Sequence, residues 1–127
     1  MPVWFRQIKT ALFFMNKYNH KIPDSELKWI LCDLDCVLAK GIWPEEGIGE
    51  PIEGAVLAVN LLTSKGYKII IHTARHWSDY ENIENWLNDN GVIFSRIVCG
   101  KILAKFSIDD RAISFDGNWN DVLKKIK

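Results

Sequence analysis

The sequence predicts an α/β protein built on an open parallel sheet, and two observations lead to this prediction. Short apolar runs typical of buried strands alternate with longer segments whose apolar residues recur at three- and four-residue steps. Each apolar run ends abruptly in polar or charged residues, as strands do at the ligand-binding edge of such sheets. Right-handed crossovers would place helices over both faces of the sheet.

Four segments are expected to form the strands. The first is Trp29-Ile30-Leu31-Cys32, and the second runs from Tyr67 to His72. Val92 to Val98 is a third candidate, and Phe106-Ser107-Ile108 is a fourth. All four are short, mostly apolar runs. Because the strands are parallel, their carboxyl ends should meet at one edge of the sheet.

Helices are expected between and after these strands. Ala55 to Ser64 is apolar at helical spacing before Gly66 stops it, and Asp79 to Asn90 has a helical apolar face. Shorter helices are expected over Lys101 to Lys105 and over Asp121 to Lys127. Strands and helices of these lengths fit one compact domain.

Residues 1–28 form an N-terminal segment that precedes the main domain, residues 29–127. Apolar residues from Val3 to Tyr18 recur with helical spacing, which predicts an amphipathic helix followed by a polar linker. This helix can pack on the domain, form a homo-oligomer contact between copies of the chain, or enter a groove of a partner. The sequence leaves these alternatives open.

Composition narrows the classes of partner and location. The 127 residues include 16 basic and 16 acidic side chains, so no broad positive field attracts extended nucleic acid or an anionic membrane surface. No apolar run is long enough for a membrane span or an export signal. The three cysteines are odd in number and form no CxxC pair, which favours a reducing compartment. We therefore expect a cytoplasmic protein with a small charged substrate.

Chemically active side chains follow all four predicted strands. In chain order they are Asp33, Asp35, Thr73, Lys101, Asp109 and Asp110. Four carboxylates in a partly dehydrated cleft would repel one another, so the pattern requires a divalent metal and a lysine. Mg²⁺ prefers carboxylate and phosphate oxygens. The pattern therefore predicts a magnesium site for a small phosphorylated substrate, with Asp33 and Asp109 as direct ligands.

Each of these residue types suits one role in phosphoryl transfer. Asp33 can attack the phosphorus and form an aspartyl-phosphate. Asp35, two residues on, can protonate the leaving oxygen and later deprotonate the attacking water. Thr73 offers a hydroxyl and nearby backbone N–H groups to the phosphate, and Lys101 offers a positive charge. Lys105 is the alternative lysine.

Several neighbouring residues have two interpretations. Asp110 can bind the metal through water or pair with Arg111 in a structural ion pair. Arg75 can contact the substrate or form an ion pair with the following helix. Trp43 and Trp77 can stack on a sugar or base, although tryptophans in loops more often cover the core.

The motifs resemble those of a known superfamily. Asp33-Leu34-Asp35-Cys36-Val37-Leu38 resembles the first motif of the haloacid dehalogenase (HAD) superfamily, and Ile70-Ile71-His72-Thr73 resembles the second. Ile71 to Arg75, Gly100-Lys101 and Ile108 to Ile113 are similar to the small capless phosphatases of capsule biosynthesis. The resemblance covers roughly residue 29 to the C-terminus.

This resemblance implies a Rossmann-like, HAD-like three-layer sandwich with a parallel central sheet. No large cap domain is expected, since the connection from Leu38 to Pro51 is short. The implied activity is magnesium-dependent hydrolysis of a phosphomonoester, such as a sugar phosphate, through an aspartyl-phosphate. A nucleotide or polynucleotide-end phosphatase and a non-catalytic phosphate-binding module are the alternatives.

The resemblance also assigns finer roles and shows two departures. It implies that the backbone carbonyl of Asp35 is a metal ligand, beside Asp33, Asp109 and Asp110, and that Ala74 helps to bind the phosphate. Cys36 stands where glycine is common, and Ile102 stands where proline often follows the lysine. Both departures leave the catalytic groups intact.

Overall fold

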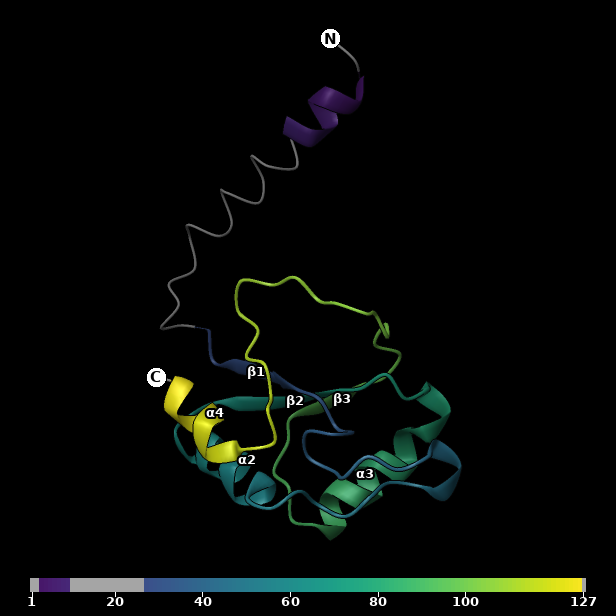
Figure 1. Cartoon of the computed structure of the whole chain (residues 1–127), viewed down its shortest axis with the longest axis vertical. Helices are drawn as coiled ribbons and strands as arrows, with labels where there is room; N and C mark the ends of the chain where they lie inside the picture. Colours follow the sequence, from purple (N-terminus) through teal and green to yellow (C-terminus); the bar gives the residue numbers. More distant parts are fainter. Residues whose placement is uncertain (1–2, 10–26, 127) are drawn as a thin grey trace.

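The structure is a computed structural model that describes residues 3–9 and 27–126, and residues 3–9 are helical. The remainder of the predicted N-terminal helix lies outside the described residues. From residue 27 on, the strands (β), helices (α) and 3₁₀ turns (η) follow in one chain order (Figure 1). They are β1 (Trp29–Cys32), η2 (Pro44–Glu46), α2 (Ala55–Ser64), β2 (Lys68–His72), η3 (Trp77–Asp79), α3 (Tyr80–Asp89), β3 (Arg96–Val98) and α4 (Trp119–Lys125).

The three strands form an open parallel sheet in the order β1-β2-β3. Cys32 pairs with Ile71, and Ile71 pairs with Ile97, so the carboxyl ends of the strands are aligned. The α/β class and the parallel sheet are thus confirmed, and the arrangement is compatible with a Rossmann-like sandwich. The third strand is shorter than expected because only residues 96–98 of the segment 92–98 join the ladder.

The helices α2 and α3 lie on one side of the sheet (Figure 1). Both crossovers step in the same direction across the sheet, so right-handed connections put both helices on the same face. α4 packs on α2 and buries Trp119 in the same core. The expectation that helices cover both faces is therefore not met by these three helices. None of the described helices is both long and apolar enough to cross a membrane.

The core lies between the sheet and these helices. Cys32, Ile71 and Ile97 point into it from the three strands and meet the apolar residues of α2 and α3. The opposite face is more open, because Trp29 is 61% exposed and Leu31 is 64% exposed. β1 was expected to be a buried strand, but in the described part of the chain it is the edge of the sheet and only Cys32 is buried.

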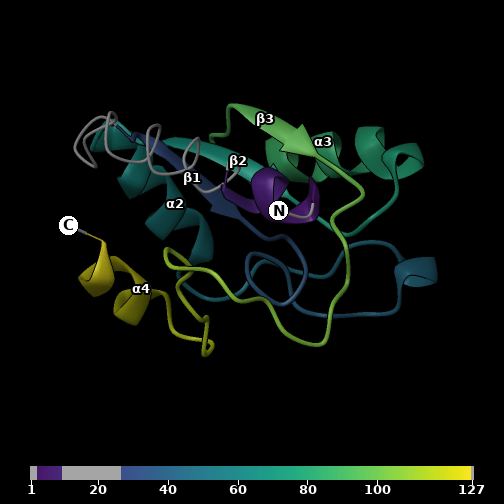
Figure 2. The same cartoon turned by 90° about the horizontal axis from the view of Figure 1, so that it is seen from above.

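The predicted helix over Lys101 to Lys105 and the predicted strand Phe106-Ser107-Ile108 are both wrong. Residues 99–118 contain no helix or strand, and Ile108 is fully exposed. A three-residue strand is stable only when a neighbouring strand pairs with it, and this segment has no ladder partner among the described residues. Figure 2 shows the segment passing the carboxyl ends of the strands before it reaches α4.

The helices begin and end close to the predicted residues. α2 has the predicted bounds, and α3 lies within the predicted range. α4 begins at Trp119, two residues before the predicted start, because the Asn118 side chain accepts hydrogen bonds from the N–H groups of Asn120 and Asp121.

Candidate active site

A tight turn after β1 holds the first motif. The carbonyl oxygen of Leu34 accepts hydrogen bonds from the N–H groups of Leu38 and Ala39, each at 2.9 Å. Cys36 has a φ of 66°, a left-handed conformation that is rare for residues other than glycine. One oxygen of Asp33 accepts the Leu34 N–H at 2.8 Å. The turn thereby fixes a half-buried carboxylate directly beyond the end of β1.

Lys101 lies beside this carboxylate. The Lys101 Nζ atom is 3.6 Å from Oδ2 of Asp33, and the Lys101 N–H donates to the carbonyl oxygen of Thr73 at 2.9 Å. Lys105 instead has its ammonium group over the Phe106 ring, 5.6 Å from the centroid. The structure therefore brings Lys101, and not Lys105, to Asp33.

Thr73 joins the end of β2 to the end of β3. Its N–H donates to the carbonyl oxygen of Val98 at 2.9 Å, and its Oγ1 accepts the Arg75 N–H at 3.1 Å. Thr73 is completely buried, while Ala74 beside it is half-buried. The buried Thr73 side chain therefore stabilises the turn that leads to Arg75. Asp33, Thr73 and Lys101 follow three adjacent parallel strands, as the sequence predicted.

Arg75 has a partner that the sequence did not indicate. Its Nε and Nη2 atoms donate to the two oxygens of Asp35 at 2.8 and 2.9 Å, and Nη2 also donates to the carbonyl oxygen of Gly47 at 2.8 Å. These bonds to Asp35 raise the pKa of Arg75 more than burial lowers it. The sequence left open a substrate contact or an ion pair with the following helix, whereas the hydrogen-bonded ion pair of Arg75 is with Asp35 of the first motif.

Asp109 and Asp110 do not complete the predicted magnesium site. Both are exposed, and Asp109 Oδ1 accepts the Arg111 N–H at 2.8 Å. Within residues 3–9 and 27–126, no three His, Cys, Asp or Glu side chains are arranged to hold a metal ion. Asp109 and Asp110 are not brought to Asp33 because the expected fourth strand, Phe106-Ser107-Ile108, does not form. Among the described residues, the carboxylates of the motifs are therefore not gathered into one metal-binding cluster.

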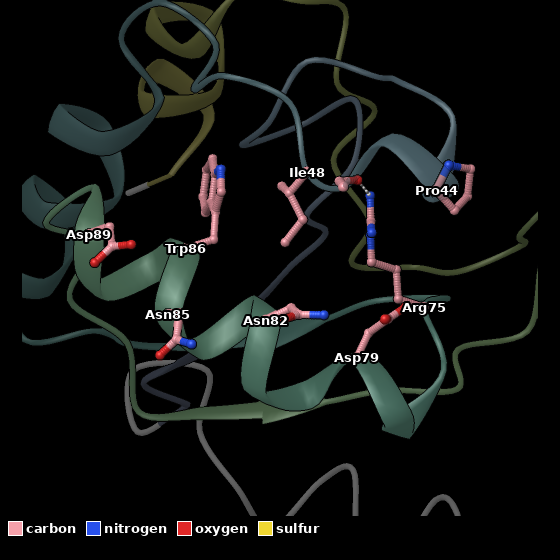
Figure 3. Close-up of a pocket in the computed structure, with 9 residues that line it drawn as sticks. Pro44, Ile48, Arg75, Asp79, Asn82, Asn85, Trp86 and Asp89 are labelled. Carbon is pink, nitrogen blue, oxygen red and sulfur yellow. Dashed lines mark hydrogen bonds between the residues drawn. The ribbon is translucent and has the colours of Figure 1, made fainter.

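An open pocket of about 400 Å³ lies between α3 and the loop that contains η2 (Figure 3). Its lining residues are Pro44, Gly47, Ile48, Arg75, Asp79, Asn82, Asn85, Trp86 and Asp89. The loop is held on both sides of Ile48, by the Arg75 bond to Gly47 and by the bond from the Trp86 indole N–H to the Gly49 carbonyl oxygen at 2.9 Å. Asp33 and Lys101 do not line this pocket.

The cysteines differ in exposure. Cys32 and Cys99 are buried, and Cys36 is exposed. Burial, and after it the nearby Asp33 charge, raise the pKa of Cys32 from 9.0 to about 12. The two tryptophans in the loops are also exposed, Trp43 by 74% and Trp77 by 53%, so neither serves mainly to cover the core.

No family model and no curated protein matches the chain. Two solved structures do. One is a crystal structure of a target protein from Vibrio cholerae, with 24% identity and a TM-score of 0.58 over 79% of this chain and 99% of that one. The other is a conserved protein from Bacteroides thetaiotaomicron, with 23% identity and a TM-score of 0.59 over 77% of this chain and 88% of that one. The likeness is one of fold alone.

Proposed function

We propose that the chain is a HAD-type phosphomonoester hydrolase in which Asp33 is the nucleophile. The observation that carries this proposal is the 3.6 Å contact between Asp33 and Lys101 at the ends of two parallel strands. Thr73, at the end of the intervening strand β2, accepts a hydrogen bond on its carbonyl oxygen from the Lys101 N–H. A carboxylate paired with an ammonium group at this edge of an α/β sheet is suited to receive a phosphate.

The reaction would proceed in two displacements at phosphorus. An oxygen of Asp33 attacks, its bond to phosphorus forms, and the bond to the leaving oxygen breaks. Lys101 offsets the repulsion between the carboxylate and the phosphate oxygens. The leaving oxygen then takes up a proton. Water attacks the aspartyl-phosphate and loses a proton, and inorganic phosphate departs with Asp33 regenerated.

Asp35 is the group that we assign to proton transfer. Both of its oxygens accept hydrogen bonds from the Arg75 guanidinium group. A carboxylate can accept the proton of the attacking water. To donate a proton to the leaving oxygen, Asp35 must first be protonated, and a neutral carboxyl group is a weaker acceptor for the Arg75 guanidinium than a carboxylate. The hydrogen bonds from Arg75 should therefore weaken while Asp35 holds the proton.

We also propose that magnesium is the cofactor of this hydrolase. Its support is the number of carboxylates in the motifs, which the described arrangement does not bring together. Once bound, the ion would add positive charge against the phosphate oxygens. The free thiols and the balanced charge support a cytoplasmic enzyme that acts on a small phosphorylated metabolite.

The experiment is a phosphate-release assay on the full chain. The substrates are 4-nitrophenyl phosphate and a panel of sugar and nucleoside phosphates, each with Mg²⁺ or with a chelator. Asp33→Asn should lower kcat by more than about 10³-fold, because it removes the nucleophile. Asp116→Asn is the matched control, since this exposed carboxylate only caps the Asn118 N–H, which an asparagine oxygen can also do.

The outcomes separate the alternatives. Magnesium-dependent hydrolysis that is lost in Asp33→Asn and kept in Asp116→Asn supports the phosphatase. Equal activity of the wild type and Asp33→Asn on every compound would exclude Asp33 as the nucleophile. Phosphate binding by calorimetry without any turnover would instead support a non-catalytic module.

A further inference from the structure

An exposed pair of aromatic rings stands at the start of α3. Trp77 and Tyr80 are stacked, with ring centroids 6.1 Å apart and planes inclined by 14°. Trp77 is 53% exposed and Tyr80 is 37% exposed. An indole that is exposed to this extent gains little from burial in the fold. Packing in the core therefore does not account for the pair.

The pair borders the proposed phosphate site. A Cβ atom placed on Gly100 would lie 3.5 Å from Nε1 of Trp77, so the indole edge lies against the backbone of Gly100. The Gly100 N–H donates to the carbonyl oxygen of Arg75 at 2.9 Å, which joins the two loops. The next residue is Lys101, whose ammonium group contacts Asp33. Trp77 therefore contacts the residue next to Lys101, the lysine that would bind the phosphate oxygens.

We propose that Trp77 stacks on the nucleobase of the substrate, so that the site takes a nucleoside monophosphate. This inference rests on the proposed phosphatase activity, and it names the leaving group. A nucleobase can extend the Trp77–Tyr80 stack, because every base has a flat π-face. The balanced net charge disfavours a long polynucleotide, which would need a positive groove along its backbone.

The test compares Trp77→Ala with Trp43→Ala, a change at a tryptophan that is 74% exposed in the loop before η2. KM and kcat are measured for nucleoside 5′- and 3′-monophosphates, glucose 6-phosphate and glycerol phosphate. Stacking of a base on an aromatic ring contributes about 1–3 kcal/mol, so Trp77→Ala should raise KM for the nucleotides by about 5- to 150-fold. KM for glycerol phosphate should not change, and Trp43→Ala should behave as the wild type.

Two further measurements test whether the effect of Trp77→Ala comes from the lost aromatic ring and from substrate binding. Trp77→Phe keeps a flat ring and should recover most of the lost nucleotide affinity. Adenosine monophosphate should quench the tryptophan fluorescence of Asp33→Asn, and this quenching should be lost when Trp77→Ala is added. Binding is thereby measured without turnover, and thermal unfolding shows whether each variant is folded.

The failure of this inference is distinct from the failure of the proposed function. If the wild type hydrolyses nucleotides but Trp77→Ala has unchanged KM values, the stacking role is wrong and the phosphatase stands. An increase in KM for glucose 6-phosphate alone would overturn the nucleobase assignment in favour of a sugar. If nucleotides bind through Trp77 but no compound is hydrolysed, the phosphatase proposal fails and the binding site stands.

Discussion

Replacing Arg75 by alanine tests the energetic importance of the link between the two motifs. The substitution removes three hydrogen bonds, two to the Asp35 carboxylate and one to the Gly47 carbonyl oxygen. The Arg75 side chain is 8% exposed and that of Asp35 is 33% exposed. Once the guanidinium group is gone, water can therefore reach the Asp35 carboxylate. Its hydration recovers part of the free energy of unfolding that the substitution removes.

The expected loss of unfolding free energy in Arg75→Ala lies between two limits. Breaking a fully buried ion pair costs about 3–5 kcal/mol, and an exposed pair contributes about 0–1 kcal/mol. For this partly buried, bidentate pair we expect Arg75→Ala to lower the free energy of unfolding by about 2–3 kcal/mol. At about 3–5 °C per kcal/mol for a chain of this size, Tm should fall by about 6–15 °C.

The assay is urea unfolding of the wild type, Arg75→Ala, Asp35→Asn and the double variant. The double-mutant cycle should give a coupling energy of about 1–2 kcal/mol between Arg75 and Asp35. Lys124→Ala is the control, because its 4.0 Å pair with Asp121 is largely exposed, and its effect should stay within about 0.5 kcal/mol. A coupling energy below about 0.3 kcal/mol would refute the assigned importance of the bidentate pair.

Four other predictions concern Cys36, Gly41, Cys32 and Lys101. Cys36→Gly should stabilise the chain by about 1 kcal/mol in urea unfolding, because glycine adopts the left-handed conformation without strain. A Cβ atom on Gly41 would lie 2.6 Å from the Cys36 Sγ. Gly41→Ala should therefore destabilise the wild type but be tolerated in the Cys36→Gly variant. An equal loss of unfolding free energy in both backgrounds would contradict this. Burial raises the pKa of Cys32 from 9.0 to about 12, so the unfolded chain loses this proton first. The contribution of the neutral Cys32 thiol to stability is complete below pH 9 and is lost as the pH rises toward 12. Between pH 8 and 11, the urea midpoint of unfolding should therefore fall less steeply in Cys32→Ala than in the wild type. Lys101→Ala should lower kcat/KM by about 10²- to 10³-fold in the phosphate-release assay, whereas Lys105→Ala should not.

The elements that the sequence predicted well have local signals. The helix α2 follows from the apolar spacing of Ala55 to Ser64 and from the glycine after it. The contact between Asp33 and Lys101 follows from a general rule, because Asp33 comes directly after β1 and Lys101 lies in the loop after β3, at the same edge of the parallel sheet. Such features depend on short stretches of chain or on the class of fold.

The features that were missed depend on pairing between distant residues. Phe106-Ser107-Ile108 has the composition of a strand, but a run of three residues becomes a strand only where another strand's edge accepts it. Arg75 and Asp35 are 40 positions apart, and no spacing rule connects them. Their proximity could have been suspected from the pairing of β1 with β2, but the hydrogen bonds depend on the exact turn after each strand.

The position of Arg75 has a thermodynamic consequence for the pocket beside α3. The guanidinium group lines that pocket while it donates to Asp35 and to the loop at Gly47. A ligand that accepts a hydrogen bond from Nε or Nη2 of Arg75 in the pocket competes with Asp35 for the same N–H groups. Occupancy of the pocket and the hydrogen bonding of Asp35 are therefore linked equilibria, and each changes the other by the same factor.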